Sequence, residues 1–276
     1  MTDSILAKAP LGHDAPYPTA YDPTVLFPIA RQGNRQTLAI QPAPAWHGAD
    51  IWNAYELSWL NLKGKPVVAT GCFVFSQASP CIIESKSFKL YLNSFNEGRY
   101  ENLASVQQRM QHDLSDAAGA PVEVRLNPMA TDSKENYRPL AGINIDGIDV
   151  DIDRYTPAPE LLRCMPQAAA ASEVLVSDLL KSNCPVTGQP DWGSLQVSYS
   201  GPQMDRAALL KYIISLRRHN EFHEHCVERM YCDIWQACRP SALRVYARYT
   251  RRGGLDINPW RASVAAHVDN RRTVRQ

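Results

Sequence analysis

The chain has 276 residues, 45% of them hydrophobic, which is enough for one large core or two domains of about 100–130 residues each. Its formal net charge of +1 and its pI near 7.6 exclude the large one-signed charge of a nucleic-acid coat or a polybasic membrane anchor. The sequence has no apolar run of about 18 residues and no signal-peptide pattern. We therefore expect a cytoplasmic protein that acts on a small molecule.

Two modules are predicted behind an N-terminal arm. Residues 1–45 form the arm, because 1–44 hold seven of the twenty prolines and show little periodicity. The modules are predicted over 46–155 and 160–276, with a proline-containing linker at 153–160. Each half is predicted to run as strands, two helices and strands again, which indicates a duplicated α+β unit with antiparallel sheet.

A helix is predicted after the short apolar strand that ends at Ile83. Ser85 or Ser87 can cap it, and its apolar residues recur with helical spacing. These apolar residues are Phe88, Tyr91, Leu92 and Phe95. Lys86 and Lys89 lie in the first turn, where the helix dipole disfavours cations, so their position indicates a function and not helix stability. Free backbone N–H groups and two ammonium groups at one helix end predict a phosphate site. The alternative is that the lysines are solvated and the serines serve only as caps.

The other predicted elements follow from hydrophobic periodicity and capping signals. In the first half they are a strand at 67–75, a helix at 103–118, a strand at 122–126, and a strand or tight hairpin at 142–152. In the second half they are a strand at 195–199, a helix opened by Asp205 that runs to Arg217, a helix capped by Asn220, and a strand at 243–250.

Residues 182–194 are predicted to form an irregular loop, because they contain two prolines and two glycines. A thiol on a polar loop can be reached by a ligand and activated by its neighbours, so Cys184 is the candidate nucleophile. Asp191, seven residues later, is the candidate acid. The alternative is a free cysteine that packs as a small hydrophobe beside a turn-forming aspartate.

The chain has seven cysteines without paired C-x-x-C spacing, and in a reducing compartment we expect free thiols. Cys226, Cys232 and Cys238 are spaced by six residues, which rotates each by about 240° on a helix and places them on different faces. These three cysteines are therefore not expected to form one metal site.

The last predicted helix carries an apolar stripe that begins near His223 and Glu224. Its members are Val227, Met230, Tyr231, Ile234, Trp235 and Cys238. A histidine and a glutamate at the buried end of such a face need partners, either inside the protein, at an interface or in a ligand. His219, His223 and Cys226 share a helical face at i, i+4 and i+7, which leaves a metal site as an alternative unless the helix breaks between the two histidines.

Two arginines precede two glycines at the predicted end of the strand at 243–250. In Arg251-Arg252-Gly253-Gly254, guanidinium groups and bare backbone can approach a phosphate together, or the segment is simply a basic turn. No G-x-G-x-x-G motif follows a strand, so a dinucleotide would not be bound by a Rossmann fold.

Four segments in this order resemble the NADPH-dependent 7-cyano-7-deazaguanine reductases, the nitrile reductases of queuosine biosynthesis in tRNA modification. The segments are 84–91 with Glu-Ser-Lys, 184–191 with Cys and Asp, 222–224 with Phe-His-Glu, and 251–260 with Arg-Arg-Gly-Gly. The resemblance is to the long, two-module type and covers nearly the whole chain from Trp46 onward. It implies two tandem tunnelling-fold modules, with antiparallel sheets and helix pairs on one face, in a cytoplasmic enzyme that forms a homodimer.

The resemblance also implies a role for each matching residue. Cys184 would form a thioimide with the nitrile carbon, and Asp191 would donate a proton. The substrate-binding residues would be Glu84, Ser85, Phe222, His223 and Glu224, and the cofactor-binding residues would be Ser85, Lys86, Arg252 and Gly253. The reaction would consume two NADPH to give 7-aminomethyl-7-deazaguanine, without a catalytic metal, a nucleic acid or a membrane.

Two other functions compete with this interpretation. A zinc-dependent cyclohydrolase of the same fold would use His219, His223 and Cys226 as ligands and would hold about one zinc per chain. A nucleotide-binding module without enzymatic activity is the other, and the combination of a nucleophile with an acid on one loop argues against it.

Overall fold

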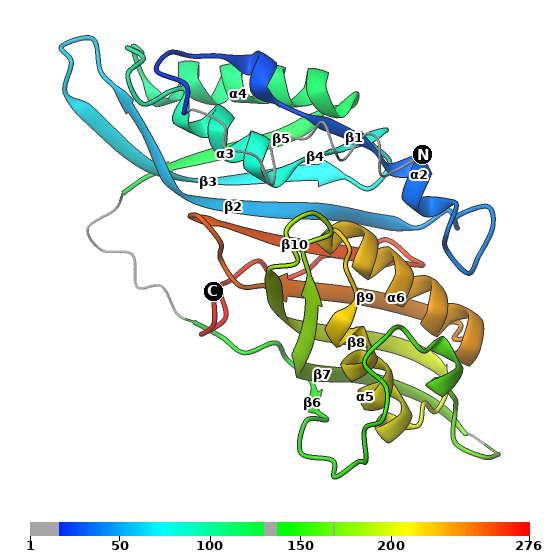
Figure 1. The fold of residues 1–276 in the computed structure, drawn as a ribbon. Helices are drawn as coiled ribbons and strands as arrows, with labels where there is room; N and C mark the ends of the chain where they lie inside the picture. The colour runs from blue at the N-terminus through cyan, green and yellow to red at the C-terminus, as the bar shows by residue number, and fades with distance from the viewer. Residues whose placement is uncertain (1–16, 130–136, 168) are drawn as a thin grey trace. The chain divides into compact units, whose positions relative to one another are not determined.

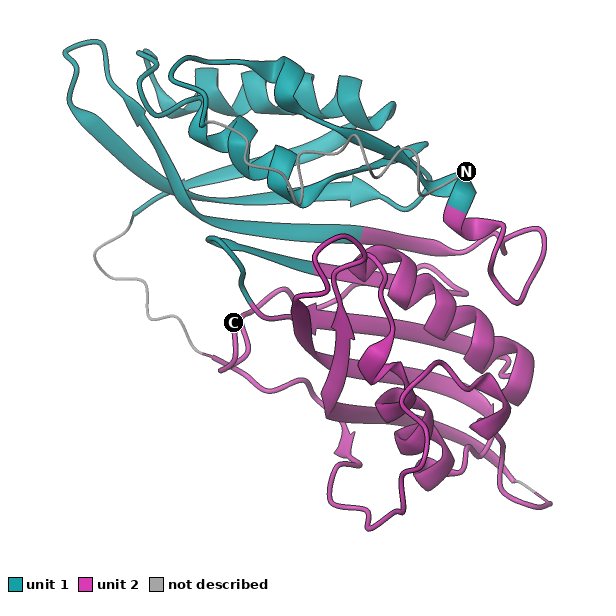
Figure 2. Cartoon of the chain, viewed as in Figure 1, with its two compact units in different colours: residues 1–33, 50–134, 251–257 teal, residues 34–49, 135–250, 258–276 magenta. Residues whose placement is uncertain are grey.

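The computed structural model describes residues 17–129, 137–167 and 169–276 (Figure 1). Its contacts divide the chain into two compact units (Figure 2). Unit 1 comprises 1–33, 50–134 and 251–257, and unit 2 comprises 34–49, 135–250 and 258–276. Each unit has its own hydrophobic core.

Unit 1 is a mixed α+β unit. Its elements are the 3-10 helix η1 (Pro23–Val25), β1 (Pro28–Ala30), β2 (His47–Leu60), β3 (Pro66–Ser76), β4 (Cys81–Ile83), α3 (Ser85–Asn93), α4 (Leu103–Ala118) and β5 (Val122–Pro128). The short helix α2 (Arg31–Arg35) and strand β2 each continue into unit 2. The strand order is β5-β3-β2, with β3 and β5 antiparallel. Figure 1 shows α3 and α4 on the same side of these strands.

The core of unit 1 is aromatic. Phe88 on α3 is fully buried, and its ring centroid lies 5.1 Å from those of Trp52 and Phe73. The rings of Tyr91 and Phe95 also pack edge to face, with their centroids 5.2 Å apart. The predicted apolar face of this helix is confirmed at Phe88, Tyr91 and Leu92, whereas buried Phe95 lies in the turn after α3. Large rings at geometries of this kind stabilise a core beyond the area they bury.

The described residues of the N-terminal arm up to Gly33 belong to unit 1, and residues 34–45 of the arm belong to unit 2. Strand β1 pairs antiparallel with β4. Arg31 is buried and forms an ion pair with buried Asp50 at 2.6 Å. The predicted extended arm is therefore partly regular structure, and its residues 1–16 lie outside the described residues.

Unit 2 contains the second strand and helix set. Its elements are β6 (Ile143–Asn144), η2 (Pro159–Leu161), β7 (Ala170–Asn183), β8 (Pro190–Pro202), α5 (Arg206–Ser215), η3 (Leu216–Arg218), α6 (His223–Cys238), β9 (Ala242–Tyr249) and β10 (Leu255–Ala262), of which β10 begins in unit 1. The order is β10-β9-β8-β7-β6, antiparallel from β10 to β7, and β6 joins β7 in parallel. Figure 1 shows α5 and α6 over one face of β7, β8 and β9.

A buried ionic cluster fixes α6 inside unit 2. Glu228 is fully buried and accepts hydrogen bonds from both Arg261 and Arg35. Although burial opposes ionisation of Glu228, the two guanidinium groups lower the pKa of its carboxyl group to about 2. The predicted apolar stripe of α6 is also buried, apart from Trp235, which is only partly buried.

Several sequence predictions need correction. The strand or hairpin predicted at 142–152 is reduced to Ile143–Asn144, because Asp146 and Gly147 turn the chain and the side chain of Asn144 accepts the N–H of Asp146. The helix expected to be capped by Asn220 begins at His223, with Phe222 as its N-cap. The helices predicted at 103–118 and from Asp205 are confirmed, with Asn102 and Asp205 as caps.

The unit boundaries differ from the predicted modules. Residues 34–49 and the expected linker at 153–160 belong to unit 2, and residues 251–257 belong to unit 1. None of the helices in the described part of the chain is long and apolar enough to cross a membrane.

Candidate active site

The segment with Cys184 and Asp191 is a β-hairpin and not the irregular loop predicted from its prolines. Strand β7 continues to Asn183 and β8 begins at Pro190, so these two residues face each other across the ladder. Pro190 is tolerated because it is the first residue of its strand, a position that proline can occupy in a sheet. Asp191 is therefore held on a strand, opposite Ser182.

Cys184 is the first residue of the turn that joins β7 to β8. Its N–H donates to the carbonyl of Gln189 at 2.9 Å, and its carbonyl accepts the N–H of Gly188 at 3.0 Å. These bonds fix the backbone of Cys184. The residue is 5% exposed, so its thiol is more buried than the predicted polar loop led us to expect.

The three helical cysteines are buried, as Cys184 is, but they lie on α6 and not on the hairpin. Burial raises the pKa of the thiols of Cys226, Cys232 and Cys238 to about 12. Such thiols stay protonated at neutral pH and are poor nucleophiles, because the thiolate is the reactive form. Among the cysteines in the described residues, Cys72, Cys81 and Cys164 are only partly buried, and none of these three lies on the hairpin.

Asp191 lies against the start of α6. It is 4% exposed, and its Oδ2 lies 3.3 Å from Nε2 of His223. The His223 ring stacks on Tyr249 of β9 with centroids 3.9 Å apart and planes 18° from parallel. Among the described residues this Nε2 has no hydrogen-bond partner, so the contact with Asp191 is one of proximity, and the stacked phenol ring holds the imidazole in place.

The hairpin and the start of α6 are joined by backbone bonds. Asn183 donates its N–H to the carbonyl of His219 at 2.8 Å and accepts the N–H of Glu221 at 3.0 Å. The structure therefore places the five predicted site residues of unit 2 on two neighbouring segments, with Asp191 in contact with His223. These residues are Cys184, Asp191, Phe222, His223 and Glu224. Glu224 is 2% exposed, as its place at the end of an apolar stripe predicted.

Two neighbours of this group were not predicted from the sequence. Glu221 accepts hydrogen bonds from the N–H of Phe222 and from the side chain of Asn34, and His225 lowers the pKa of its carboxyl group against the effect of burial. Tyr249, which supports His223, ends a stretch of β9 in which all residues from Val245 onward are buried, so no alternation of burial singles it out.

The alternative zinc site does not have the geometry that its spacing required. Helix α6 begins at His223, so His219 lies outside the helix and does not share a helical face with His223 and Cys226. Over residues 17–129, 137–167 and 169–276, no group of three or more His, Cys, Asp or Glu side chains is arranged to hold a metal ion.

The Glu-Ser-Lys motif of unit 1 lies at the start of α3, and its glutamate caps the helix. The carboxylate of Glu84 accepts the N–H of Lys86 at 2.6 Å and of Ser87 at 2.8 Å. The prediction that Ser85 or Ser87 is the cap is therefore wrong. Two backbone N–H groups expected to bind phosphate are already occupied by an anionic side chain, so the predicted phosphate site at these amides is not supported.

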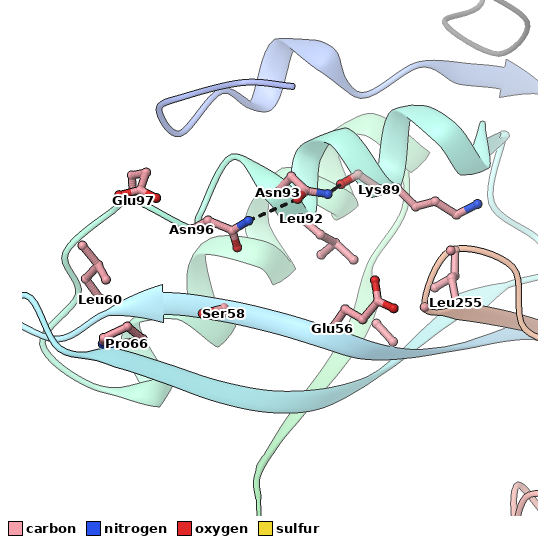
Figure 3. Close-up of a pocket in the computed structure, with 13 residues that line it drawn as sticks. Glu56, Ser58, Leu60, Pro66, Lys89, Leu92, Asn93, Asn96, Glu97 and Leu255 are labelled. Carbon is pink, nitrogen blue, oxygen red and sulfur yellow. Dashed lines mark hydrogen bonds between the residues drawn. The ribbon is translucent and has the colours of Figure 1, made fainter. Parts of the chain in front are cut away.

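The glycine turn of unit 1 lines a pocket of about 390 Å³ beside α3 (Figure 3). Gly253 and Gly254 have φ of +59° and +70°, which favours glycine, and a Cβ on Gly254 would lie 2.3 Å from the Glu56 side chain. Lys89, Glu56 and Asn93 also line the pocket. Of the four predicted cofactor residues, only Gly253 lines it; Ser85, Lys86 and Arg252 do not.

Comparisons with known proteins give one consistent family. Residues 17–126 match the family described as "Nitrile reductase, 7-cyano-7-deazaguanine-reductase N-term", and residues 190–267 match "QueF-like protein". Curated relatives named NADPH-dependent 7-cyano-7-deazaguanine reductase are 58% identical in Bordetella avium, over 95% of both chains, and 53% identical in Cupriavidus necator, over 99% of this chain and 100% of the relative.

A solved structure, the archaeosine synthase QueF-Like in the apo form, shares 17% identity over 37% of this chain and 99% of its own. Its TM-score of 0.30 is too low to support a conclusion about the fold. The curated relatives, by contrast, match over nearly their full lengths at more than half of the positions. The chain therefore belongs to the family of NADPH-dependent 7-cyano-7-deazaguanine reductases.

Proposed function

We propose that this protein reduces the nitrile 7-cyano-7-deazaguanine to 7-aminomethyl-7-deazaguanine, with Cys184 as nucleophile and Asp191 as proton donor. The observation that carries the proposal is the hairpin. It holds a fixed cysteine and a buried carboxyl group on one supersecondary unit, with Asp191 3.3 Å from His223. Nucleophile, acid and a supporting base are the parts that covalent catalysis needs within one short stretch of structure.

The residues account for the first chemical step. The Cys184 thiolate adds to the nitrile carbon, one π bond of the C≡N group breaks, and the nitrogen takes a proton from Asp191 to give a thioimide. His223, whose Nε2 lies 3.3 Å from Oδ2 of Asp191, is proposed to position the carboxyl group for this transfer. Asp191 is 4% exposed, so the proton transfer to the nitrile nitrogen would take place away from bulk water.

Glu224 is proposed to recognise the guanidine-like edge of the base, because a carboxylate can accept two parallel N–H donors. His223, Phe222, Glu84 and Ser85 would complete the substrate contacts. A carboxylate has about four lone-pair sites, of which the helix cap uses two in Glu84, so capping leaves it able to accept further bonds.

NADPH supplies the hydrides when it is bound, and Ser85, Lys86, Arg252 and Gly253 are proposed to hold it. The polar groups of this part of unit 1 suit a dinucleotide. Bare backbone at Gly253 and the ammonium group of Lys89 suit phosphate, and the carboxylate of Glu56 suits ribose hydroxyls. Because Lys86 and Arg252 would pair with the extra phosphate, NADH should be a poor substitute, and Arg252→Ala should raise KM for NADPH more than it weakens nitrile binding.

The same proposal covers the setting of the enzyme. We infer a cytoplasmic homodimer of two tandem tunnelling-fold modules that acts in queuosine biosynthesis. The order of strands, two helices and strands within each unit supports the duplication. Reduction of a nitrile to a primary amine takes four electrons, so two NADPH should be consumed for each amine formed.

The decisive experiment is to mix the protein with 7-cyano-7-deazaguanine in the absence of NADPH and to measure the intact mass. One added ligand mass and a new near-ultraviolet band are expected, and both should be lost in Cys184→Ala while noncovalent binding remains. Cys232→Ser is the matched control and should keep the adduct, because burial holds that thiol protonated. An adduct that survives in Cys184→Ala, or that peptide mapping places on another cysteine, would show the mechanism to be wrong.

A further inference from the structure

Unit 2 has a pocket of about 500 Å³ on the outer side of the β7–β8 hairpin, made of residues that have no role in the proposed reaction. Apart from Gly188 and Pro190, its lining residues carry cationic, aromatic or amide side chains, and no carboxylate is among its described lining residues. The ones that matter here are Tyr155, Lys181, Asn183, Trp192, Arg217 and Arg218. A pocket with three cations and no acid is a site for an anion.

The pocket follows from the alternation of the hairpin. Lys181 pairs with Trp192 across the ladder, and the next pair is Ser182 with Asp191. Successive side chains of a strand point to opposite faces. The buried face therefore carries Asp191 toward His223, and the opposite face carries Lys181 and Trp192 into the pocket.

The two arginines are placed by aromatic rings and not by acids. The guanidinium carbon of Arg217 lies 5.4 Å from the centroid of Trp192, and that of Arg218 lies 5.4 Å from the centroid of Tyr155. The backbone N–H of Arg218 also donates to the carbonyl of Tyr155 at 3.0 Å. Within the part of the chain that the structure describes, neither guanidinium group has a hydrogen bond or an ion pair, so their N–H donors remain available.

Lys181 is the third cation and is half-buried. Its ammonium group donates to Oδ1 of Asn183 at 2.5 Å and to the carbonyl of Arg217 at 2.8 Å, which leaves one of its three N–H donors. Burial and the charge of Arg217 lower the pKa of the Lys181 ammonium group, although Asp191 opposes them. A bound anion would offset the repulsion between the positive charges of Lys181 and Arg217.

We propose that this pocket binds a phosphate group through Lys181, Arg217 and Arg218. Guanidinium groups bind phosphate oxygens in pairs, and the ammonium group adds a point charge from the floor of the pocket. Trp192, which is 38% exposed, keeps Arg217 oriented. A free phosphate, a 5′-nucleotide and a 2′-phosphorylated nucleotide all offer this group. The site uses none of the residues assigned to the cofactor and does not depend on that assignment.

Titration calorimetry with inorganic pyrophosphate tests the proposal on the full chain. Arg217→Gln with Arg218→Gln should weaken binding about tenfold or more, and Lys181→Met alone should weaken it severalfold. AMP and adenosine 2′,5′-bisphosphate, titrated in parallel, distinguish the sources, because the tighter ligand identifies the phosphate that the pocket selects.

The matched control is Arg125→Gln with Arg271→Gln, which removes the same charge from two exposed arginines that are already paired with Glu123 and Asp269. Thermal unfolding should show each variant to be folded. The proposal is overturned if wild type binds none of the three ligands at about 10 mM. It is equally overturned if the pocket variants bind pyrophosphate as wild type does, or if the control variant loses as much affinity as they do.

Discussion

Helices α3 and α6 each begin at a motif that carries a glutamate, and the two beginnings are built differently. At α3 the glutamate precedes the helix, and the side chain of Glu84 folds back onto the N–H groups of Lys86 and Ser87. At α6 the N-cap is Phe222, whose side chain cannot accept a hydrogen bond, and Glu224 lies within the first turn. Glu84 therefore caps α3, whereas Glu224 does not cap α6.

The position of the acid relative to the first helical residue explains this difference. An acid at the N-cap satisfies backbone donors of its own helix, whereas an acid one or two residues later cannot reach them in that way. The start of α6 is approached instead by the hairpin, with Asp191 3.3 Å from His223. A motif with a glutamate therefore indicates a ligand site only when the helix boundary is known.

The largest expected effect is on catalysis at the start of α6. Asp191→Asn keeps the size of the side chain but removes the proton, so kcat should fall by about 10²–10⁴-fold. The rate of adduct formation in the absence of NADPH, measured from the near-ultraviolet band of the adduct, should also fall. Asp149→Asn, at an exposed position, is the control and should match wild type. Unchanged turnover in Asp191→Asn would remove Asp191 from the reaction and leave its contact with His223 structural.

The next effect concerns what anchors each helix. Helix α3 packs through aromatic rings, whereas α6 is held by the buried ion pairs of Glu228 with Arg35 and Arg261. Glu228→Gln leaves two guanidinium groups without their carboxylate, and the free energy of unfolding at neutral pH should fall by about 3–5 kcal/mol. Urea unfolding measures this loss. Glu123→Gln, in an exposed pair, should change it by less than about 1 kcal/mol.

The same residue predicts a pH dependence. The pKa of Glu228 is lowered in the folded protein to about 2 from 4.5. Its contribution is fully present above pH 4.5 and is lost as the pH falls toward 2, because the unfolded state takes up the proton first. The difference in unfolding free energy between wild type and Glu228→Gln should shrink over this range, and a constant difference would contradict the assignment.

The four long helices could be predicted from the sequence, whereas the strands β2, β7 and β10 were not predicted, and the site depended on details that local patterns do not determine. The apolar face of α3 from Phe88 to Leu92 and the apolar stripe of α6 were predicted correctly, because the burial of one helical face requires apolar residues at helical spacing. The hairpin was missed because the two prolines and two glycines of residues 182–194 were read as an irregular loop, whereas Pro185 lies in the turn and Pro190 is the first residue of β8. The pairing of Tyr249 with His223 joins residues 26 positions apart in the chain, and no local pattern indicates it.

Removing the cap of α3 should have a smaller effect. Glu84→Ala leaves the N–H groups of Lys86 and Ser87 without their acceptor and should cost about 0.5–2 kcal/mol of unfolding free energy. Glu84→Gln keeps an amide oxygen that can accept these bonds and should lose less stability. Calorimetry of nitrile binding to both variants then separates the cap from the proposed substrate contact, since a Gln variant that is stable but binds weakly shows that the charge serves the ligand.

The smallest expected effect comes from giving α6 the kind of cap that α3 has. Phe222→Ser and Phe222→Ala both remove the ring, which lies 5.9 Å from the ring of His225, so their comparison cancels the lost packing. Only serine can accept an N–H from the first turn, and it should be more stable than alanine by about 0.5–1 kcal/mol in urea unfolding. Equal stability would mean that another group already accepts these N–H bonds. A group of the hairpin would then cap α6, as Glu84 caps α3. The two helix ends would differ only in the segment that supplies the hydrogen-bond acceptor.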